Sequence, residues 1–468
     1  MIAAALLAAS LWTPGDLANA RHAIETALTA PTLRGAHVGL LAVDAGTGEV
    51  LYEHNASDDF TPASTFKLLV GSAALARLGP AFTFVTEVDA SETALVLRGG
   101  GDARLSAQDL GLAAQAVAAT GAKHFDTLTG DATRYDADRY PGGWSIDDLP
   151  YDYAAIPSAL SLEENVVHAA VAPGDAAGSS TGLVTAPVTD VLTIKNDTTT
   201  GARGSEDTTD VVRPWDRPAT IELVGSVPLG VKISDDLAPA VPDPPAYALD
   251  VFRLDLIQDG IDIGTTTQAQ YAPSPATTTI WKHPSDPLSK TLGLFWQPSD
   301  NLIAEQLLLE LGASSPTAAA ERAKIGTRAG GAKVERAWLQ SIGVDPHTVT
   351  IFDGSGLSEY DRITPNALVA ILKYDWTGLN RQTVLDALPL AGVRGTLKAS
   401  FAGTPLAGNV YAKTGTINHA RTLAGYLKTP HHGTIAFALM INDWMDASPN
   451  ASESVAKAQA AVLNALHQ

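Results

Sequence analysis

A serine and a lysine three positions apart, Ser64 and Lys67, open an apolar helical run, and this pair constrains the chain more than any other feature. Residues i and i+3 share one face of a helix, so the Lys67 amine can reach the Ser64 hydroxyl. A serine hydroxyl becomes a nucleophile when a neighbour takes its proton, and an amine does so when burial or a nearby cation lowers its pKa. Phe66, Leu68 and Leu69 surround the lysine with apolar residues. The stretch therefore predicts a serine nucleophile with a lysine base.

The same spacing occurs a second time, at Ser454 and Lys457 in a predicted C-terminal helix, so spacing alone is weak evidence for a site. The two serines differ in the motifs that accompany them. Ser299-Asp300-Asn301 and Lys413-Thr414-Gly415-Thr416 come later in the chain than Ser64, and nothing similar comes after Ser454. We therefore predict chemistry at Ser64 and a solvated helix face at Ser454.

Composition excludes several classes of function. A chain of 468 residues predicts two or more domains, and a net charge of -20 makes nucleic acid and anionic membrane surfaces poor partners. The absence of cysteine excludes disulfides and thiolate chemistry and is compatible with an extracytoplasmic protein. No spacing of His, Asp or Glu resembles a metal site, so we predict no metal and no cofactor.

The N-terminal run over residues 1–12 is apolar, but it is too short to cross a bilayer and lacks a basic start. Two interpretations remain open: residues 1–15 are a truncated signal peptide, or the run is a buried N-terminal segment. Asp16 is predicted to be the N-cap of a helix that extends to Ala30. No other stretch is long and apolar enough for a transmembrane segment, so we predict none.

Secondary-structure patterns divide the chain into outer parts and a middle part. A hairpin over residues 37–52 leads into the Ser64 helix, which Gly79 and Pro80 should end. Short β-branched segments dominate residues 83–275. The expected helices lie at 246–258, 300–311, 318–343, 365–374 and 452–466, and further strands lie at 409–412, 420–428 and 434–441.

These patterns predict an α+β fold in which separated parts of the chain form one domain. Residues 16–82 and 276–468 would build an antiparallel sheet flanked by helices, with the strand that carries Lys413 beside the Ser64 helix. Residues 83–275 would form a large β-rich insertion of one or more modules.

The three motifs, in this order, resemble the signature of penicillin-binding proteins and serine β-lactamases. Neighbouring sequence narrows the resemblance to the D-alanyl-D-alanine carboxypeptidases/endopeptidases among the class C low-molecular-mass penicillin-binding proteins, the S13 peptidase family. The long gap between Ser64 and Ser299 fits that family, because the second motif follows far sooner in β-lactamases. The stretches that carry the resemblance are PASTFKLL from Pro62, YAAIPSALSLEEN from Tyr153, SDNL from Ser299, DGSGLS from Asp353 and AKTGT from Ala412.

The resemblance implies a penicillin-binding protein/β-lactamase-like transpeptidase domain and a role for each motif residue. Ser64 would attack the carbonyl of a D-Ala-D-Ala bond to form an acyl-enzyme, with Lys67 as general base. Ser299 would relay a proton toward the leaving amine. Asn301 would hold Lys67 and the substrate amide.

The lysine motif would bind the substrate. Lys413 would lower the pKa of the first lysine and, with Thr414, hold the terminal carboxylate. Gly415 would let the substrate backbone approach the strand edge. The oxyanion hole would consist of the backbone N–H groups of Ser64 and Thr416.

One stretch departs from the family. After Ser358 the family commonly has a basic residue and then an asparagine, whereas this chain has Glu359 and Asp361. The departure leaves the core chemistry alone but affects substrate-side contacts of that loop. For Ser355, in the same stretch, a tight-turn role is favoured over catalysis.

The sequence thus predicts an extracytoplasmic serine DD-peptidase, located in the periplasm, in the cell wall or outside the cell. It would act as a carboxypeptidase on peptidoglycan stem peptides, with endopeptidase action on cross-links as a further expectation, and β-lactams would acylate it. Two alternatives stay open: a β-lactamase or esterase on the same fold, and a catalytically silent cell-wall scaffold.

Overall fold

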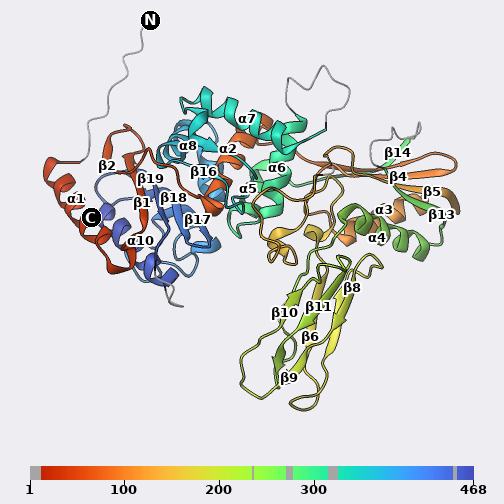
Figure 1. The fold of residues 1–468 in the computed structure, drawn as a ribbon. Helices are drawn as coiled ribbons and strands as arrows, with labels where there is room; N and C mark the ends of the chain where they lie inside the picture. Colours follow the sequence, from red (N-terminus) through yellow and green to blue (C-terminus); the bar gives the residue numbers. More distant parts are fainter. Residues whose placement is uncertain (1–11, 137, 235–236, 270–277, 315–324, 446–450) are drawn as a thin grey trace, which may run out of the picture. The chain divides into compact units, whose positions relative to one another are not determined.

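The computed structural model describes residues 12–136, 138–234, 237–269, 278–314, 325–445 and 451–468. The chain forms two compact units (Figure 1). Unit 1 comprises Met1–Phe82, Pro287–Asp300 and Arg328–Gln468, and unit 2 comprises Thr83–Asp286 and Asn301–Thr327.

Unit 1 is built on a five-stranded antiparallel sheet in the order β17-β18-β19-β1-β2. Strands from the two ends of the chain meet in its centre, where Leu40 of β1 pairs with Leu439 of β19, and Leu439 pairs with Leu423 of β18. The strands of this sheet are β1 His37–Asp44, β2 Val50–His54, β17 Val410–Ile417, β18 Ala420–Lys428 and β19 Thr434–Asn442.

Helices cover both faces of this sheet. Leu40 and Ala42 of β1 share one core cluster with helices α1 and α10, and the alternate residues Leu41 and Val43 face the other way, where they line a cavity with Val369 of α8. The sandwich of helices around an antiparallel sheet confirms the predicted α+β class. The helices of unit 1 are α1 Pro14–Leu28, α2 Lys67–Leu78, α5 Leu288–Trp296, α7 Arg328–Ser341, α8 Pro365–Thr377, α9 Arg381–Ala387 and α10 Ala451–His467.

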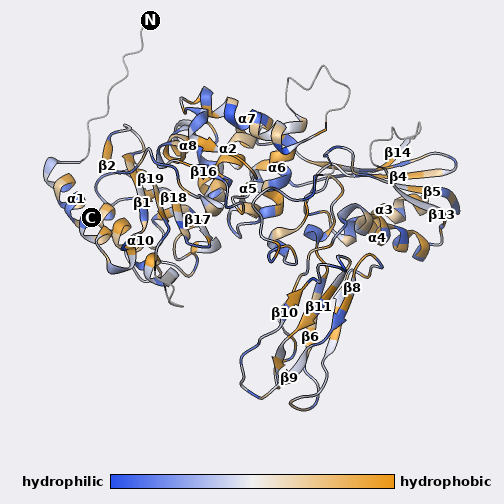
Figure 2. Ribbon diagram, viewed as in Figure 1, coloured by the Kyte–Doolittle hydropathy of each residue, from blue (hydrophilic) through white to orange (hydrophobic). Residues whose placement is uncertain are grey.

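The helix that follows Ser64 is buried on nearly every side. A short 3-10 turn, Ala63–Phe66, leads directly into α2, whose residues 67–75 are all buried (orange for most of its length in Figure 2). A helix that is hydrophobic all round belongs in a core. Gly79 has φ 85°, a conformation that glycine adopts without strain, and it ends α2 as the sequence predicted.

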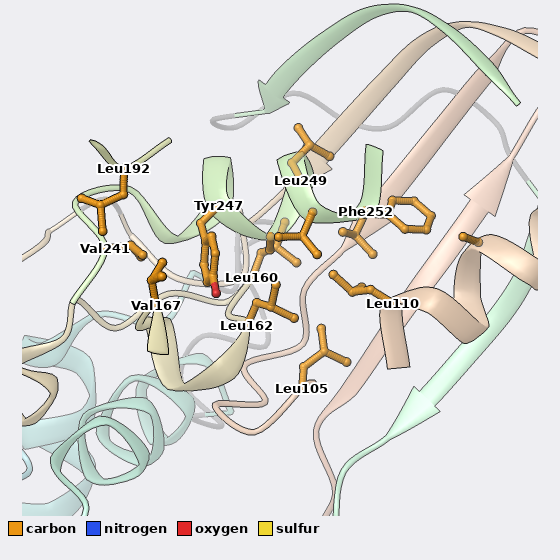
Figure 3. Packing of buried hydrophobic residues seen from close by; sticks show 14 of the residues in the cluster. Leu105, Leu110, Leu160, Leu162, Val167, Leu192, Val241, Tyr247, Leu249 and Phe252 are labelled. Atoms are coloured by element: carbon orange, nitrogen blue, oxygen red, sulfur yellow. The ribbon is translucent and has the colours of Figure 1, made fainter. Parts of the chain in front are cut away.

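Unit 2 contains a mixed five-stranded sheet in the order β13-β5-β4-β3-β14. Leu110 of α3 and Tyr247, Leu249 and Phe252 of α4 belong to its core (Figure 3). Its elements are β3 Val85–Ala90, β4 Ala94–Arg98, α3 Ala107–Ala119, β5 His124–Asp131, α4 Pro244–Gln258, β13 Asp262–Ala269, β14 Thr278–Pro284 and α6 Asn301–Ala313.

Between β5 and α4 the chain forms a series of short strands. They make three small sheets, ordered β10-β11-β8, β12-β9 and β6-β7. This is the β-rich texture expected for the middle of the chain. The strands are β6 His168–Ala172, β7 Gly182–Ala186, β8 Thr193–Asn196, β9 Thr199–Gly201, β10 Asp210–Val212, β11 Thr220–Val224 and β12 Ser226–Pro228.

Two segments belong to unit 2, although they were predicted to be part of the domain that contains Ser64. They are residues 278–286 and 301–314. The second is helix α6, and its buried Gln306 donates to the Ser158 carbonyl at 2.9 Å and to the Ser161 hydroxyl at 2.8 Å. Buried amide hydrogen bonds of this kind explain why α6 belongs with the middle of the chain.

The start of the described chain corrects one detail. Asp16 is not the N-cap of α1; Thr13 is, and Asp16 completes a capping box three residues later. Residues 1–11 of the predicted signal peptide lie outside the described residues, and Trp12 is buried against His432. Within the part of the chain that the structure describes, no helix is long and apolar enough to span a membrane.

Candidate active site

Ser64 and Lys67 meet as the sequence predicts. Ser64 lies in the 3-10 turn, Lys67 is the first residue of α2, and the Lys67 Nζ lies 2.9 Å from the Ser64 Oγ. The lysine side chain is fully buried, whereas Ser64 is partly exposed. This geometry pairs an accessible hydroxyl with a buried amine, the arrangement expected of a serine and its base.

The loop before Ser64 is held from the sheet side. The Asn442 Oδ1 accepts the Thr61 N–H at 2.8 Å, and the Asn442 Nδ2 donates to the Thr61 carbonyl at 3.2 Å. The Thr422 hydroxyl donates to the Pro62 carbonyl at 2.6 Å. These hydrogen bonds hold the backbone just before Ser64 in one conformation.

Gly415 also packs against this loop. A Cβ at Gly415 would lie 2.9 Å from the Ser64 backbone nitrogen and 2.3 Å from the Thr422 Oγ1. Glycine is therefore required for the close approach of β17 to the Ser64 turn. From the sequence, glycine at this position was expected to let the substrate backbone approach the strand edge. Its packing against the Ser64 turn is a second reason for glycine here.

The turn over residues 353–358 positions the lysine. The Ser355 carbonyl accepts a hydrogen bond from Lys67 Nζ at 2.8 Å. The Asp353 carboxylate accepts the N–H groups of Gly356 at 2.6 Å and of Ser358 at 2.7 Å, which holds the turn. The turn's contact with the lysine thus uses a backbone carbonyl, in keeping with the expected turn role.

Trp296 contacts the backbone of Lys67, and this contact was not predicted from the sequence. Its indole Nε1 donates to the Lys67 carbonyl at 2.9 Å, and the ring lies where a Cβ on Gly71 would stand, at 2.5 Å. A glycine inside an otherwise apolar helix was the one available signal of such a contact.

Lys413 completes a second pair. Its Nζ donates to the Ser299 Oγ at 2.8 Å and to the Thr414 carbonyl at 2.9 Å. Burial, together with the charge of Lys67, holds the pKa of Lys413 well below its usual value. The sequence predicted that Lys413 lowers the pKa of Lys67, and the structure shows the converse effect of the same repulsion. Ser299 adopts φ 72°, an uncommon conformation for serine.

Strand β17 leaves half of its outer edge open among the described residues. The segment 389–391 pairs with its first half, where the Ala412 N–H donates to the Pro389 carbonyl at 3.1 Å. Strand alternation then directs the backbone N–H groups of Thr414 and Thr416 to the same side. Beyond Ala412 this edge presents backbone groups next to the Ser64 turn.

Asn301 is the first residue of α6 and belongs to unit 2. Its amide Nδ2 donates to the Tyr153 carbonyl at 2.7 Å, and the side chain is nearly buried. Its expected contact with Lys67 and the substrate amide stays a prediction.

The second Ser-x-x-Lys lies in α10, and its lysine is solvated. The Lys457 side chain is 75% exposed and pairs with Glu453 one turn earlier, at 2.8 Å. Ser454 therefore lacks the buried amine that Ser64 has.

The loop that departs from the expected pattern is ordered by its own residues. Asp361 is buried, and its Oδ1 accepts the Phe352 N–H at 2.7 Å. Arg362 donates to the backbone carbonyls of Glu359 and Asp361. Among the described residues, no group of three or more His, Asp or Glu side chains could hold a metal ion.

Comparison with known proteins places this geometry in context. A model of the D-Ala-D-Ala carboxypeptidase 3 (S13) family matches residues 20–465. The D-alanyl-D-alanine carboxypeptidase of Actinomadura sp. (strain R39) is 33% identical, over 92% of this chain and 82% of that protein. The D-alanyl-D-alanine carboxypeptidase DacB of Haemophilus influenzae is 25% identical, over 89% of this chain and 88% of that protein.

Solved structures show the same fold. Penicillin-binding protein 4 (dacB) of Haemophilus influenzae superposes with a TM-score of 0.81 at 22% identity, over 95% of this chain and 99% of that chain. The endopeptidase Bd3459 of Bdellovibrio bacteriovorus superposes with a TM-score of 0.52 at 17% identity, over 92% of this chain and 93% of that chain. These likenesses confirm the predicted penicillin-binding protein-like fold.

Proposed function

The chain belongs to the D-Ala-D-Ala carboxypeptidase 3 (S13) family of peptidases, and from this premise we propose that it cleaves D-Ala-D-Ala bonds through an acyl-enzyme on Ser64. The observation that carries the proposal is the 2.9 Å contact between the Ser64 hydroxyl and the buried Lys67 amine. Its substrates are peptidoglycan stem peptides, met outside the cytoplasm.

In the acylation step, Ser64 Oγ bonds to the carbonyl carbon of the penultimate D-Ala, and its proton passes to neutral Lys67. Two buried lysines in one site repel each other as cations, and without substrate this repulsion, together with burial, lowers the pKa of Lys413. The proposal requires that the substrate carboxylate pairs with Lys413 and restores its charge, which leaves Lys67 as the neutral amine. The Ser355 carbonyl accepts one N–H of Lys67 and so keeps its Nζ at the serine.

The backbone supplies the oxyanion hole. The N–H groups of Ser64 and Thr416 would bind the tetrahedral oxygen, and the substrate would lie along the open half of β17 as an added strand. One such donor typically contributes about 10²- to 10³-fold in rate. Gly415, which brings β17 against the Ser64 turn, sets the spacing between the two donors.

Departure of the terminal D-Ala needs a proton on its nitrogen as the C–N bond breaks. Ser299 would donate that proton and recover one through its 2.8 Å hydrogen bond from Lys413. Lys413 and Thr414 would hold the leaving carboxylate before cleavage. Water then attacks the ester carbonyl and gives up a proton, which returns to Lys413 through Ser299, while Lys67 returns its proton to Ser64 as the shortened peptide leaves. Asn301 would orient Lys67 and the substrate amide.

Endopeptidase action on cross-links requires the same bond changes with a larger leaving amine, and we propose it as a second activity of the same site. β-Lactams would acylate Ser64 by ring opening. A structure of the Haemophilus influenzae penicillin-binding protein 4, with a TM-score of 0.75 to this chain, is described as a complex with a β-lactam. We also propose that residues 16–82 and 276–468 supply the DD-peptidase domain, with 83–275 as its insertion, although the segments 278–286 and 301–314 pack with the inserted residues in unit 2.

Intact-protein mass after incubation with benzylpenicillin tests the proposal in wild type and Ser64→Ala. We expect a single persistent adduct on the wild type and none on the variant. Rapid destruction of penicillin without an adduct would indicate a β-lactamase instead. Intact penicillin without an adduct would indicate a catalytically silent scaffold.

A further inference from the structure

Two aromatic rings stand exposed in contact with each other on the loop that positions Lys67. Phe352 is 42% exposed and Tyr360 is 57% exposed, and their ring centroids lie 5.3 Å apart in an edge-to-face arrangement. Large aromatic side chains are enriched where proteins bind partners, because they offer much rigid contact area. A contacting pair left in solvent is therefore informative, whereas single exposed apolar residues are ordinary.

The backbone that carries the pair, hereafter the 352/360 platform, is held by hydrogen bonds. The N–H of Phe352 is bound by the buried carboxylate of Asp361, and Arg362 donates to the carbonyls of Glu359 and Asp361. A backbone held in this way need not be ordered when a ligand covers the rings. The departure from the family pattern in this loop thus produces an ordered platform.

The platform is close along the chain to the catalytic lysine. Phe352 lies three residues before Ser355, a reach of roughly 10 Å at most. The Ser355 carbonyl is 2.8 Å from the Lys67 Nζ, and that nitrogen is 2.9 Å from the Ser64 hydroxyl. With the length of the Phe352 side chain added, the platform lies within roughly 25 Å of the nucleophile.

The charges around the platform limit what it can bind. Glu359 is exposed next to Tyr360, and Asp59, 71% exposed, forms an ion pair with Arg362 at 3.7 Å, so these three charged side chains carry one net negative charge. Carboxylates here repel the acidic groups of a stem peptide but accept hydrogen bonds from hydroxyl and amide N–H groups. A neutral sugar ring has apolar faces for the rings and a polar rim for the carboxylates.

We propose that the 352/360 platform binds an N-acetylated sugar of the glycan strand that carries the stem peptide. This inference rests on the proposed function. The stem is attached to the sugar, and its four residues up to the scissile bond span roughly 13 to 14 Å when extended, a length inside that upper limit. The site would thus favour stems on glycan over free peptides.

The test compares D-Ala release from a disaccharide-pentapeptide with release from the same pentapeptide without sugar. In the double variant Phe352→Ala/Tyr360→Ala we expect KM to rise about 5- to 10-fold for the glycosylated substrate, because the rings no longer contact the sugar. KM for the free peptide should stay within about twofold of wild type, as should acylation by benzylpenicillin. Tyr374→Ala, which removes another exposed aromatic ring of unit 1, should change neither substrate.

Equal losses on both substrates, or no loss on either, would overturn the platform assignment while leaving the proposed function intact. If the wild type releases D-Ala from neither substrate, the proposed function fails. Calorimetric binding of the disaccharide-peptide to wild type and double variant then still decides the platform, and equal affinities would overturn it.

Discussion

The two Ser-x-x-Lys motifs share a spacing and differ in surroundings. Lys67 is fully buried and contacts Ser64, whereas Lys457 is 75% exposed and contacts a carboxylate, Glu453. Spacing brings a lysine near a serine in both helices. Burial decides which lysine can be a base, because only a desolvated amine is driven toward its neutral form.

The difference originates in how the two helices pack. Helix α2 contacts α5, α7 and α8, so nearly all of its first half is enclosed. Helix α10 turns only one face to the sheet, through Val455, Val462 and Leu466 among others. An enclosed helix can desolvate a cation, and a surface helix cannot.

Replacing each serine by alanine is the most direct test of the difference between the two motifs. We expect Ser64→Ala to lower the rate of D-Ala release from a stem pentapeptide by about 10⁴-fold or more, because the nucleophile is lost. Ser454→Ala should stay within about twofold of wild type. The measurement is D-Ala release under single-turnover conditions, and similar losses in both variants would refute the assignment of the site to Ser64.

Alanine substitutions at two glycines distinguish steric crowding at the Ser64 turn from backbone strain alone. Gly356 and Gly403 have nearly the same φ, 75° and 74°, but a Cβ at Gly356 would lie 2.0 Å from the Ala63 carbonyl oxygen and one at Gly403 meets nothing within 4 Å. We expect Gly356→Ala to lower the free energy of unfolding by roughly 3 to 5 kcal/mol and to slow acylation. Gly403→Ala should cost about 1 kcal/mol and leave acylation unchanged. Denaturant melts and penicillin adduct rates measure both, and equal losses would show that the Ser64 turn is not crowded.

The enclosure of α2 also predicts a pH dependence. Ser72 of α2 donates to the buried Asp375 carboxylate at 2.7 Å, and burial raises the pKa of this carboxyl to about 7 from 3.8. The folded state thus holds a proton that the unfolded state releases, so the stabilising contribution is present below about pH 4 and is lost as pH rises through 7.

The variant Asp375→Asn should abolish this dependence. The difference in unfolding free energy between variant and wild type should shift by roughly 2 to 4 kcal/mol in favour of the variant between pH 4 and pH 8. Urea melts across this range provide the measurement. A difference that stays constant with pH would mean that the Asp375 carboxyl ionises normally.

The smallest effect is expected for the ion pair at the second Ser-x-x-Lys motif. Glu453→Ala removes the ion pair of Lys457, and exposed pairs of this spacing contribute little to stability. We expect a slight fall in the melting temperature, which should shrink at high salt, and no change in D-Ala release. A large fall in the melting temperature would mean that the pair is less solvated than its exposure indicates.

Local patterns predicted the sheet of unit 1, α2, α8 and α10, because their periodicity and end signals lie within the elements themselves. Helix α3 was missed although Ser106 and Asp109 form a capping box, because the surrounding sequence is β-rich. The short helices α5 and α9 were also missed.

The contacts that hold Lys67 were not predictable from local sequence. Ser355 and Trp296 reach Lys67 across 288 and 229 positions of the chain. Such contacts exist only once the fold has formed. The motif residues could be named from sequence, whereas the backbone carbonyl and indole that hold Lys67 could not.

The half-open edge of β17 has a consequence for self-association. Exposed strand edges are templates for pairing between copies of a protein. Here the segment 389–391 occupies the first half of one outer edge, and β2, only five residues long, forms the other. The free stretch beyond Ala412 accommodates a short peptide but offers few rungs to a second sheet. The edge that would receive substrate is thus protected from aggregation by its own shortness.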